Sequence, residues 1–176
     1  MKRSKILAAL LLVIGALICT VSVQAYMRRQ TDVVENVFVP AKVSCSVEEE
    51  FIDGVKRNVK VRNTGNIDAY IRATVIATFV SDDGKVLATA PAEGTDYTVI
   101  WAAEGWTKGA DGFWYHTKSV KPNETTAPLI NSAQMVSAPS GYRLHIQILA
   151  TGIQSAPDHV VQESWGVSIN NGEIIP

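Results

Sequence analysis

The sequence predicts an all-β fold: a two-sheet, jelly-roll-like sandwich with one short helix, preceded by an N-terminal signal helix. Two long stretches, 70–80 and 142–150, alternate apolar and polar residues with the period of a strand that has one face in a core. Shorter alternating stretches, separated by turn residues, recur about every ten residues, which favours a sandwich over an α/β arrangement. A chain of 176 residues, 47% of them hydrophobic, can bury such a core.

The strand at 70–80 is expected to organise the fold. Its core-facing positions are all apolar: Ile71, Ala73, Val75, Ala77 and Phe79. The strand at 142–150 has a similar length and pattern, so we expect the two to form the pair of core strands. Just before the first strand, Asn63-Thr64-Gly65-Asn66 has the chemistry of a turn and predicts a hairpin that joins 59–62 to 70–80.

The other strands are predicted from shorter alternations and from the turns between them. Residues 43–51 and 55–62 are expected to form a hairpin about the Asp53-Gly54 turn. The remaining strands are expected at 85–89, 97–101, 113–118 and, as an edge strand, near 125–130, with loops at 90–96 and 105–112.

One helix is expected after the second long strand. Ser155 is its expected cap, and Pro157 suits its first turn. Asp158 favours the positive end of the helix dipole, and Gly166 closes the helix. The tail beyond contains Asn171-Gly172, so it is expected to form a small hairpin or to fray.

The N-terminus has the pattern of an export signal. Three basic residues precede an uncharged run at 6–23. Ala25 then supplies the small residue before Tyr26 that a signal peptidase requires, so we expect cleavage there and secretion of the mature protein. An uncleaved membrane anchor is the alternative, because the run is about as long as the shortest membrane-spanning helices. The expected organisation is a signal peptide at 1–25, an N-terminal extension at 26–40 and a sandwich domain at 41–176.

The extension contains the candidate assembly strand. Its apolar residues are Val33, Val34, Val37, Phe38 and Val39. Pro40, which cannot donate a backbone hydrogen bond, ends this segment. Such a strand has two possible partners: it pairs within its own sheet, or it adds to the edge of a sheet in another molecule.

Charge and cysteine content narrow the class of partner. The whole chain has a formal net charge of −1, and residues 1–25 hold three basic and no acidic residues, so the mature chain carries −4. This balance argues against nucleic acid as a partner. The mature chain keeps one cysteine, Cys45, which excludes an intramolecular disulfide. Its alternation with Val43 and Val47 predicts a buried, inert thiol.

No catalytic motif is found in the sequence, and no cofactor is expected. The histidines His116, His145 and His159 lack the H-E-x-x-H spacing of a zinc protease, so they are expected to be surface or packing residues. A G-x-S-x-G motif and a glycine-rich phosphate loop are also lacking. Asp82 and Asp83 indicate a turn more than a calcium site.

Aromatic residues cluster in the middle of the chain: Trp101, Trp106, Trp114 and Tyr115. Such a cluster can form a platform for a sugar or a peptide. The alternative that we favour is that Trp101, with either Trp106 or Trp114, fills the space between the sheets.

Four segments carry a family resemblance. They are Ala25-Tyr26 at the signal junction, T-D-V-V-E-N-V-F at 31–38, N-T-G-N-I-D-A-Y-I-R at 63–72, and 148–154 leading into 158–166. Together with the long apolar run, they resemble the TasA and camelysin family of exported bacterial proteins. The resemblance spans most of the chain, and its most specific parts are the signal junction and the N-T-G-N run.

The resemblance implies a jelly-roll domain that a SipW-like signal peptidase releases to the cell surface or the extracellular matrix. For TasA-like members it implies biofilm fibres built by donating an N-terminal strand to the next subunit, which maps onto 26–39. The implied partners are that peptidase and other copies of this chain or related matrix subunits. The camelysin branch implies instead a surface metalloprotease. A monomeric binding module that uses the aromatic cluster is a third hypothesis.

Overall fold

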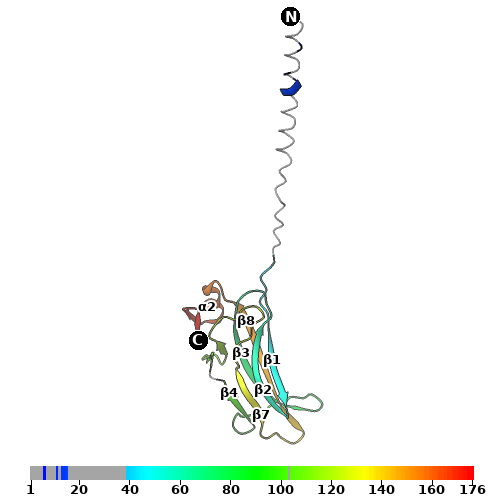
Figure 1. Cartoon of the computed structure of the whole chain (residues 1–176). Helices are drawn as coiled ribbons and strands as arrows, with labels where there is room; N and C mark the ends of the chain where they lie inside the picture. Colours follow the sequence, from blue (N-terminus) through cyan, green and yellow to red (C-terminus); the bar gives the residue numbers. More distant parts are fainter. Residues whose placement is uncertain (1–5, 7–10, 12, 16–38, 103) are drawn as a thin grey trace. The chain divides into compact units, whose positions relative to one another are not determined.

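A computed structural model describes residues 6, 11, 13–15, 39–102 and 104–176 (Figure 1). The chain divides into two units, Met1–Val39 and Pro40–Pro176. The predicted signal junction, Ala25-Tyr26, and the candidate strand residues Val33, Val34, Val37 and Phe38 lie outside the described residues. Val39 is described and is exposed. Within the described part of the chain, no helix is long and apolar enough to cross a membrane.

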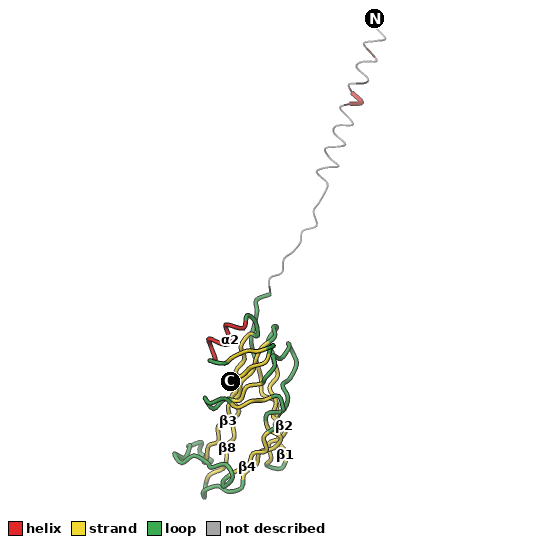
Figure 2. Tube along the Cα trace, turned by 90° about the vertical axis from the view of Figure 1, so that its left-hand side faces the viewer, coloured by secondary structure: helices red, strands yellow, loops and turns green. Residues whose placement is uncertain are grey.

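The unit Pro40–Pro176 is an all-β sandwich, which confirms the predicted fold class. Two antiparallel four-stranded sheets form its layers, with β1 and β2 in one and β3 and β8 in the other (Figure 2). Sheet A has the order β1 (Cys45–Ile52), β2 (Val55–Asn63), β7 (Ile130–Met135) and β4 (Tyr97–Trp101). Sheet B has the order β5 (Trp106–Lys108), β6 (Trp114–His116), β3 (Ala69–Ser81) and β8 (Tyr142–Gln154).

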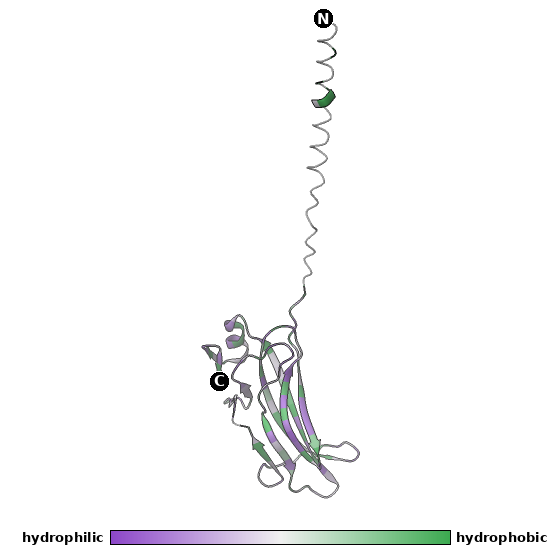
Figure 3. Cartoon of the chain, in the orientation of Figure 1, coloured by the Kyte–Doolittle hydropathy of each residue, from purple (hydrophilic) through white to green (hydrophobic). Residues whose placement is uncertain are grey.

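The two longest strands, β3 and β8, pair along their whole lengths, as the sequence predicts. Their register is unbroken from Ala69 opposite Gln154 to Ser81 opposite Tyr142. Hydrophobic and hydrophilic residues alternate along the strands (Figure 3), so that each sheet presents apolar side chains to the other. The fully buried residues of this core are Val59, Val61, Ile71, Ala73, Leu129 and Ile130.

A second, smaller core lies on the outer face of sheet B. Tyr70 precedes Ile71 in β3, so its side chain points to the opposite side of the sheet. There Tyr70 packs with Tyr115 of β6 and with Val161 of helix α2 (Asp158–Trp165). Ile174 completes this core from the terminal hairpin of β9 (Ser168–Asn170) and β10 (Glu173–Ile175). The helix and the hairpin in the tail are thus confirmed.

The predicted hairpin between β2 and β3 is wrong. β2 lies in sheet A, where it pairs with β1 and β7, whereas β3 lies in sheet B. The loop 63–66 therefore crosses from one sheet to the other. Asn63 supports this crossing, because its fully buried amide nitrogen donates to the backbone oxygens of Ile67 and Val120, both at 2.8 Å. A hairpin turn and a crossover use the same residue types, so local sequence did not separate them.

Three other strand assignments also need correction. The strand expected near 125–130 is β7, which starts only at Ile130 and lies inside sheet A rather than at its edge. Before it, Pro128 has no N–H to continue a ladder with β2. Residues 85–89 form a single bridge, between Val86 and Val80, instead of a strand. The predicted loop 105–112 contains the short strand β5.

The helix α2 begins differently from the prediction. Its N-cap is Pro157, which has no side-chain capping bond, whereas Ser155 donates its backbone N–H to the oxygen of Asp68 at 3.0 Å. Ser155 is therefore held by the start of β3 and is not the cap. Gly166 ends the helix as predicted, with a φ of 68° that a residue with a side chain adopts only at a cost.

Candidate functional site

The edges of the two sheets are the places where another strand can add, because the outer backbone groups there have no neighbouring strand. Sheet A ends at β1 and β4, and sheet B ends at β5 and β8. The strand β8 has 13 residues, against 8 in β1, 5 in β4 and 3 in β5. Among the described strands β8 pairs only with β3. The longest edge of the sandwich is therefore open on one side.

The edge strand of sheet A that lies next to β8 is β1, and charged side chains protect it from pairing. Glu48, Glu49 and Glu50 follow one another in it, and its ladder with β2 shifts register between Glu48 and Glu50. Consecutive charges and a bulge both discourage the addition of a strand. In β8, by contrast, Arg143 is the one Lys, Arg, Asp or Glu residue, and the register is regular. Of the two, β8 is therefore the candidate acceptor edge for an added strand.

A hollow lies between β8 and β1, beside this open edge. It has two adjoining parts, of about 260 and 250 Å³, which share Lys56 and Ile146. Val47 and Ile148 line the first part, and the second is more apolar. The apolar lining residues of the second part are Phe51, Ala133, Met135, Leu144 and Ile146. Because β1, β2, β7 and β8 all contribute, the hollow exposes part of the space between the two sheets.

One ion pair lies in the wall of the hollow. Lys56 Nζ donates to both carboxylate oxygens of Glu49 at 2.6 Å. The side chain of Lys56 is only 13% exposed, so its charge is neutralised where water is scarce. An apolar occupant therefore does not have to bury an unpaired Lys56 ammonium group.

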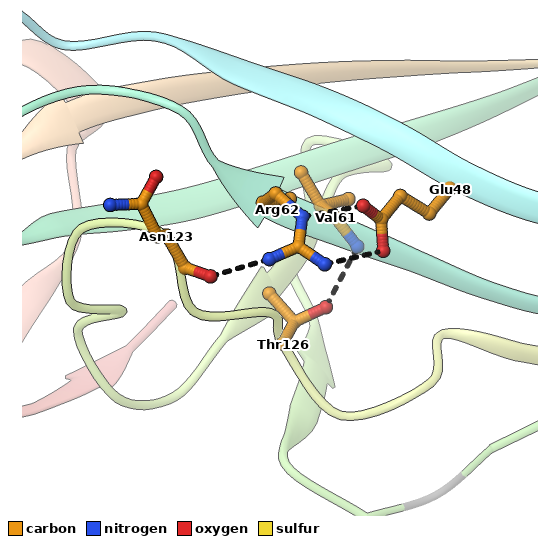
Figure 4. A network of polar contacts seen from close by, with 5 residues as sticks. All are labelled: Glu48, Val61, Arg62, Asn123 and Thr126. Atoms are coloured by element: carbon orange, nitrogen blue, oxygen red, sulfur yellow. Dashed lines mark hydrogen bonds and ion pairs between the residues drawn. The ribbon is translucent and has the colours of Figure 1, made fainter.

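A polar network ties β1 to β2 beside the bulge (Figure 4). Arg62 Nε donates to Glu48 at 2.5 Å, and Arg62 Nη1 donates to the backbone oxygen of Asn123 at 2.5 Å. The hydrogen bond from Arg62 lowers the pKa of the Glu48 carboxyl group. Next to this pair, the buried hydroxyl of Thr126 accepts from the N–H of Val61 at 3.0 Å. The network thus joins β1, β2 and the loop that contains Asn123 and Thr126.

The three histidines lie in three different environments. His145 is exposed on β8 and lines the hollow, and His159 is exposed on α2. His116 is partly buried against the edge of the Trp106 ring, with Nδ1 2.7 Å from the backbone oxygen of Lys118. Burial lowers the pKa of His116. Among the described residues, no three His, Cys, Asp or Glu side chains are grouped so that they could hold a metal ion.

The aromatic cluster lies largely between the sheets, as favoured from the sequence. Trp101 of sheet A stacks on Trp114 of sheet B, with ring centroids 4.7 Å apart. Trp106 is buried and donates to the backbone oxygen of Ala127 at 2.9 Å. Beside the stacked pair lies a pocket of about 120 Å³. Tyr115 is buried on the other face of sheet B, so the four aromatics do not form one platform.

Two smaller predictions concern Cys45 and the acidic turn. Cys45 is half-buried and packs against the main core, and burial raises the pKa of its thiol, which keeps the thiolate form scarce.

In the acidic turn, Asp83 pairs with Lys85 at 2.6 Å, and its pKa is lowered by hydrogen bonds from Lys85 and Ser81. Asp82 lies 3.4 Å from Arg143. These carboxylates thus have cationic partners within the protein.

The candidate acceptor edge, β8, was not identified from the sequence. The regular pattern of residues 142–150 predicts a core strand, but whether a strand lies at an edge depends on pairings between distant segments. The run Glu48-Glu49-Glu50, inside an otherwise alternating strand, was the available signal that one edge is protected. In comparisons with known proteins, no family model, no curated protein and no solved structure matches this chain.

Proposed function

We propose that this protein is a secreted structural protein of the cell surface or extracellular matrix that assembles into fibres by strand donation. Residues 33–39 of one subunit add to β8 of the next and cover the hollow between β8 and β1. The observation that carries this proposal is the open 13-residue edge of β8 beside an apolar hollow. A SipW-like signal peptidase frees the donor segment by cleavage after Ala25.

The donor segment suits this acceptor in length and in pattern. Seven extended residues span about 23 Å, which is shorter than a 13-residue strand. In an extended conformation Val33, Val37 and Val39 share one face with Glu35, and the three valines can cover apolar residues of the hollow. The backbone of the segment meets the free N–H and C=O groups of β8. Because donor and acceptor are different surfaces, the contact repeats head to tail and gives a filament.

Deletion of residues 26–39 tests this proposal. The shortened chain should be a folded, soluble monomer that no longer forms fibres under the electron microscope, whereas the chain starting at Tyr26 should form them. A synthetic peptide with the sequence of residues 33–39 should bind the shortened chain and slow the elongation of the longer one. A peptide with the same residues in scrambled order is the control. Fibres formed by the shortened chain would refute strand donation.

A metalloprotease and a binding module remain the alternatives from the sequence. The protease would be favoured if the purified protein cleaves casein and a chelator abolishes this activity. Replacing His116, His145 and His159 together should then abolish it as well. A protein that does not polymerise and binds a glycan or peptide through the pocket beside Trp101 and Trp114 would favour the binding module.

A further inference from the structure

We propose that the loop 63–66 is a clip that fixes the root of the N-terminal arm, and that Asn66 is its positioning residue. The arm is residues 26–39, and the root is residues 40–44, which lead into β1. This inference rests on the proposed function, in which the arm is the donor strand. It assigns a role to the N-T-G-N run beyond the connection of two strands.

Asn66 holds the root with both its side chain and its backbone. Its Nδ2 donates to the backbone oxygen of Pro40 at 2.9 Å, and its Oδ1 accepts from the N–H of Lys42 at 2.6 Å. Its own N–H donates to the oxygen of Lys42 at 3.0 Å. Asn66 is nevertheless exposed, and its amide is not needed to fill a core. An exposed asparagine that binds a neighbouring segment at three points is well placed to position that segment.

The rest of the loop completes the clip. The N–H groups of Thr64 and Gly65 both donate to the oxygen of Ser44, at 2.9 and 3.1 Å. Gly65 has no room for a side chain, because a Cβ atom there would lie 2.3 Å from the oxygen of Lys42. The root therefore lies directly on the backbone of the loop, which explains the glycine without any need for unusual dihedral angles.

Asn63 anchors the clip to the rest of the domain through hydrogen bonds. Asn63 is fully buried, and besides its bonds to Ile67 and Val120 it accepts from the N–H of Gly65 at 2.9 Å. Its backbone N–H and C=O bond to Glu124 and Asn123. All hydrogen-bonding groups of this buried residue thus have partners, which makes the loop a fixed support for the root.

The bonds of the clip prolong the ladder between β1 and β2. That ladder ends with Cys45 opposite Asn63, and the contacts of Ser44 with Thr64 and of Lys42 with Asn66 continue it outward. The root is therefore held extended beyond the end of β1. To enter the hollow of its own subunit, the arm would have to reverse at Pro40. The clip thus fixes the point at which the arm joins the domain, and this favours donation to another subunit.

The test compares Asn66→Ala with Asn170→Ala, a matched change at an exposed position in β9, in the secreted chain. Hydrogen exchange should be about fivefold faster at the amide of Lys42 in Asn66→Ala, because a hydrogen bond contributes about 1 kcal/mol. Fibre elongation from identical seeds should slow severalfold in Asn66→Ala, while thermal unfolding of the domain stays within a few degrees of that of the unmodified chain. Asn170→Ala should match the unmodified chain in all three measurements.

Unchanged exchange at Lys42 in Asn66→Ala would overturn the clip, and so would faster exchange with undiminished elongation. Failure of the proposed function gives a different result: the unmodified chain then forms no fibres. In that case the exchange rate at Lys42 still decides whether Asn66 holds the root.

Discussion

At the scale of single residues, His116 shows how a local environment selects one protonation state. The neutral ring satisfies both of its neighbours, because Nδ1–H donates to the oxygen of Lys118 and Nε2 faces the N–H of Ala127 at 3.4 Å. A proton on Nε2 would oppose that N–H, and the ring is partly buried beside Trp106. Burial therefore lowers the pKa of His116 below its ordinary value of 6.5.

This lowered pKa predicts a pH dependence of stability. The unfolded chain takes up a proton on His116 at a higher pH than the folded chain, so the free energy of unfolding falls as the pH drops from about 6.5 through the folded-state pKa. The contribution is fully present above the unfolded-state pKa. Urea unfolding between pH 7.5 and 4.5 measures it. His116→Gln should flatten this slope relative to the unmodified chain, whereas His159→Gln, a change at an exposed residue, should retain it. Equal slopes in all three proteins would contradict the assignment.

At the scale of the elements, the two edge strands that flank the hollow differ in how they are protected. β1 carries three consecutive glutamates and a bulge, whereas β8 is regular and nearly uncharged. Of the two edges that flank the hollow, this asymmetry makes β8 the more open to pairing with an added strand.

Replacing Glu48, Glu49 and Glu50 with threonine should therefore weaken the specificity of assembly. Threonine favours strands and removes the repulsion between edges, so we expect faster, irregular aggregation that light scattering detects. The control replaces Glu104, Glu124 and Glu163, which are exposed outside β1, with threonine and changes the net charge equally. Because Glu48 and Glu49 also pair with Arg62 and Lys56, both variants are compared at a temperature at which circular dichroism shows them to be folded. If the two triple variants then aggregate at the same rate, net charge rather than edge protection explains the effect.

The elements also show where local sequence suffices. The period of residues 70–80 and 142–150 predicts both long strands and their pairing, and Asp53-Gly54 predicts its turn, in which both residues have positive φ. The crossover at 63–66 was mistaken for a hairpin, because its geometry depends on burial of Asn63 against Val120, which is distant in sequence. The acceptor hollow could not be predicted for the same reason: its walls come from four strands that only the tertiary fold brings together.

At the scale of the whole molecule, the strand donation that we propose would link assembly to stability. A donor strand that covers the hollow and pairs with β8 binds only the folded subunit, so it raises the free energy of unfolding by mass action. Fibres of the chain that starts at Tyr26 should therefore unfold at a higher temperature than the monomer that lacks 26–39. Scanning calorimetry measures both, and adding the peptide of residues 33–39 to the monomer should recover part of the difference. A peptide that leaves the unfolding temperature of the monomer unchanged would speak against binding.

Photochemical cross-linking from Phe38 tests strand donation between subunits most directly. One chain carries benzoylphenylalanine in place of Phe38 and a uniform ¹⁵N label, and a second chain carries neither. The two are assembled together, and the fibres are irradiated and digested. Phe38 lies on the face of the donor strand opposite to the hollow, so we expect cross-linked peptides that join the labelled arm to unlabelled residues of β8. Cross-links only between labelled segments in these mixed fibres, or only to surfaces away from β8 and the hollow, would contradict the assembly proposed for this protein.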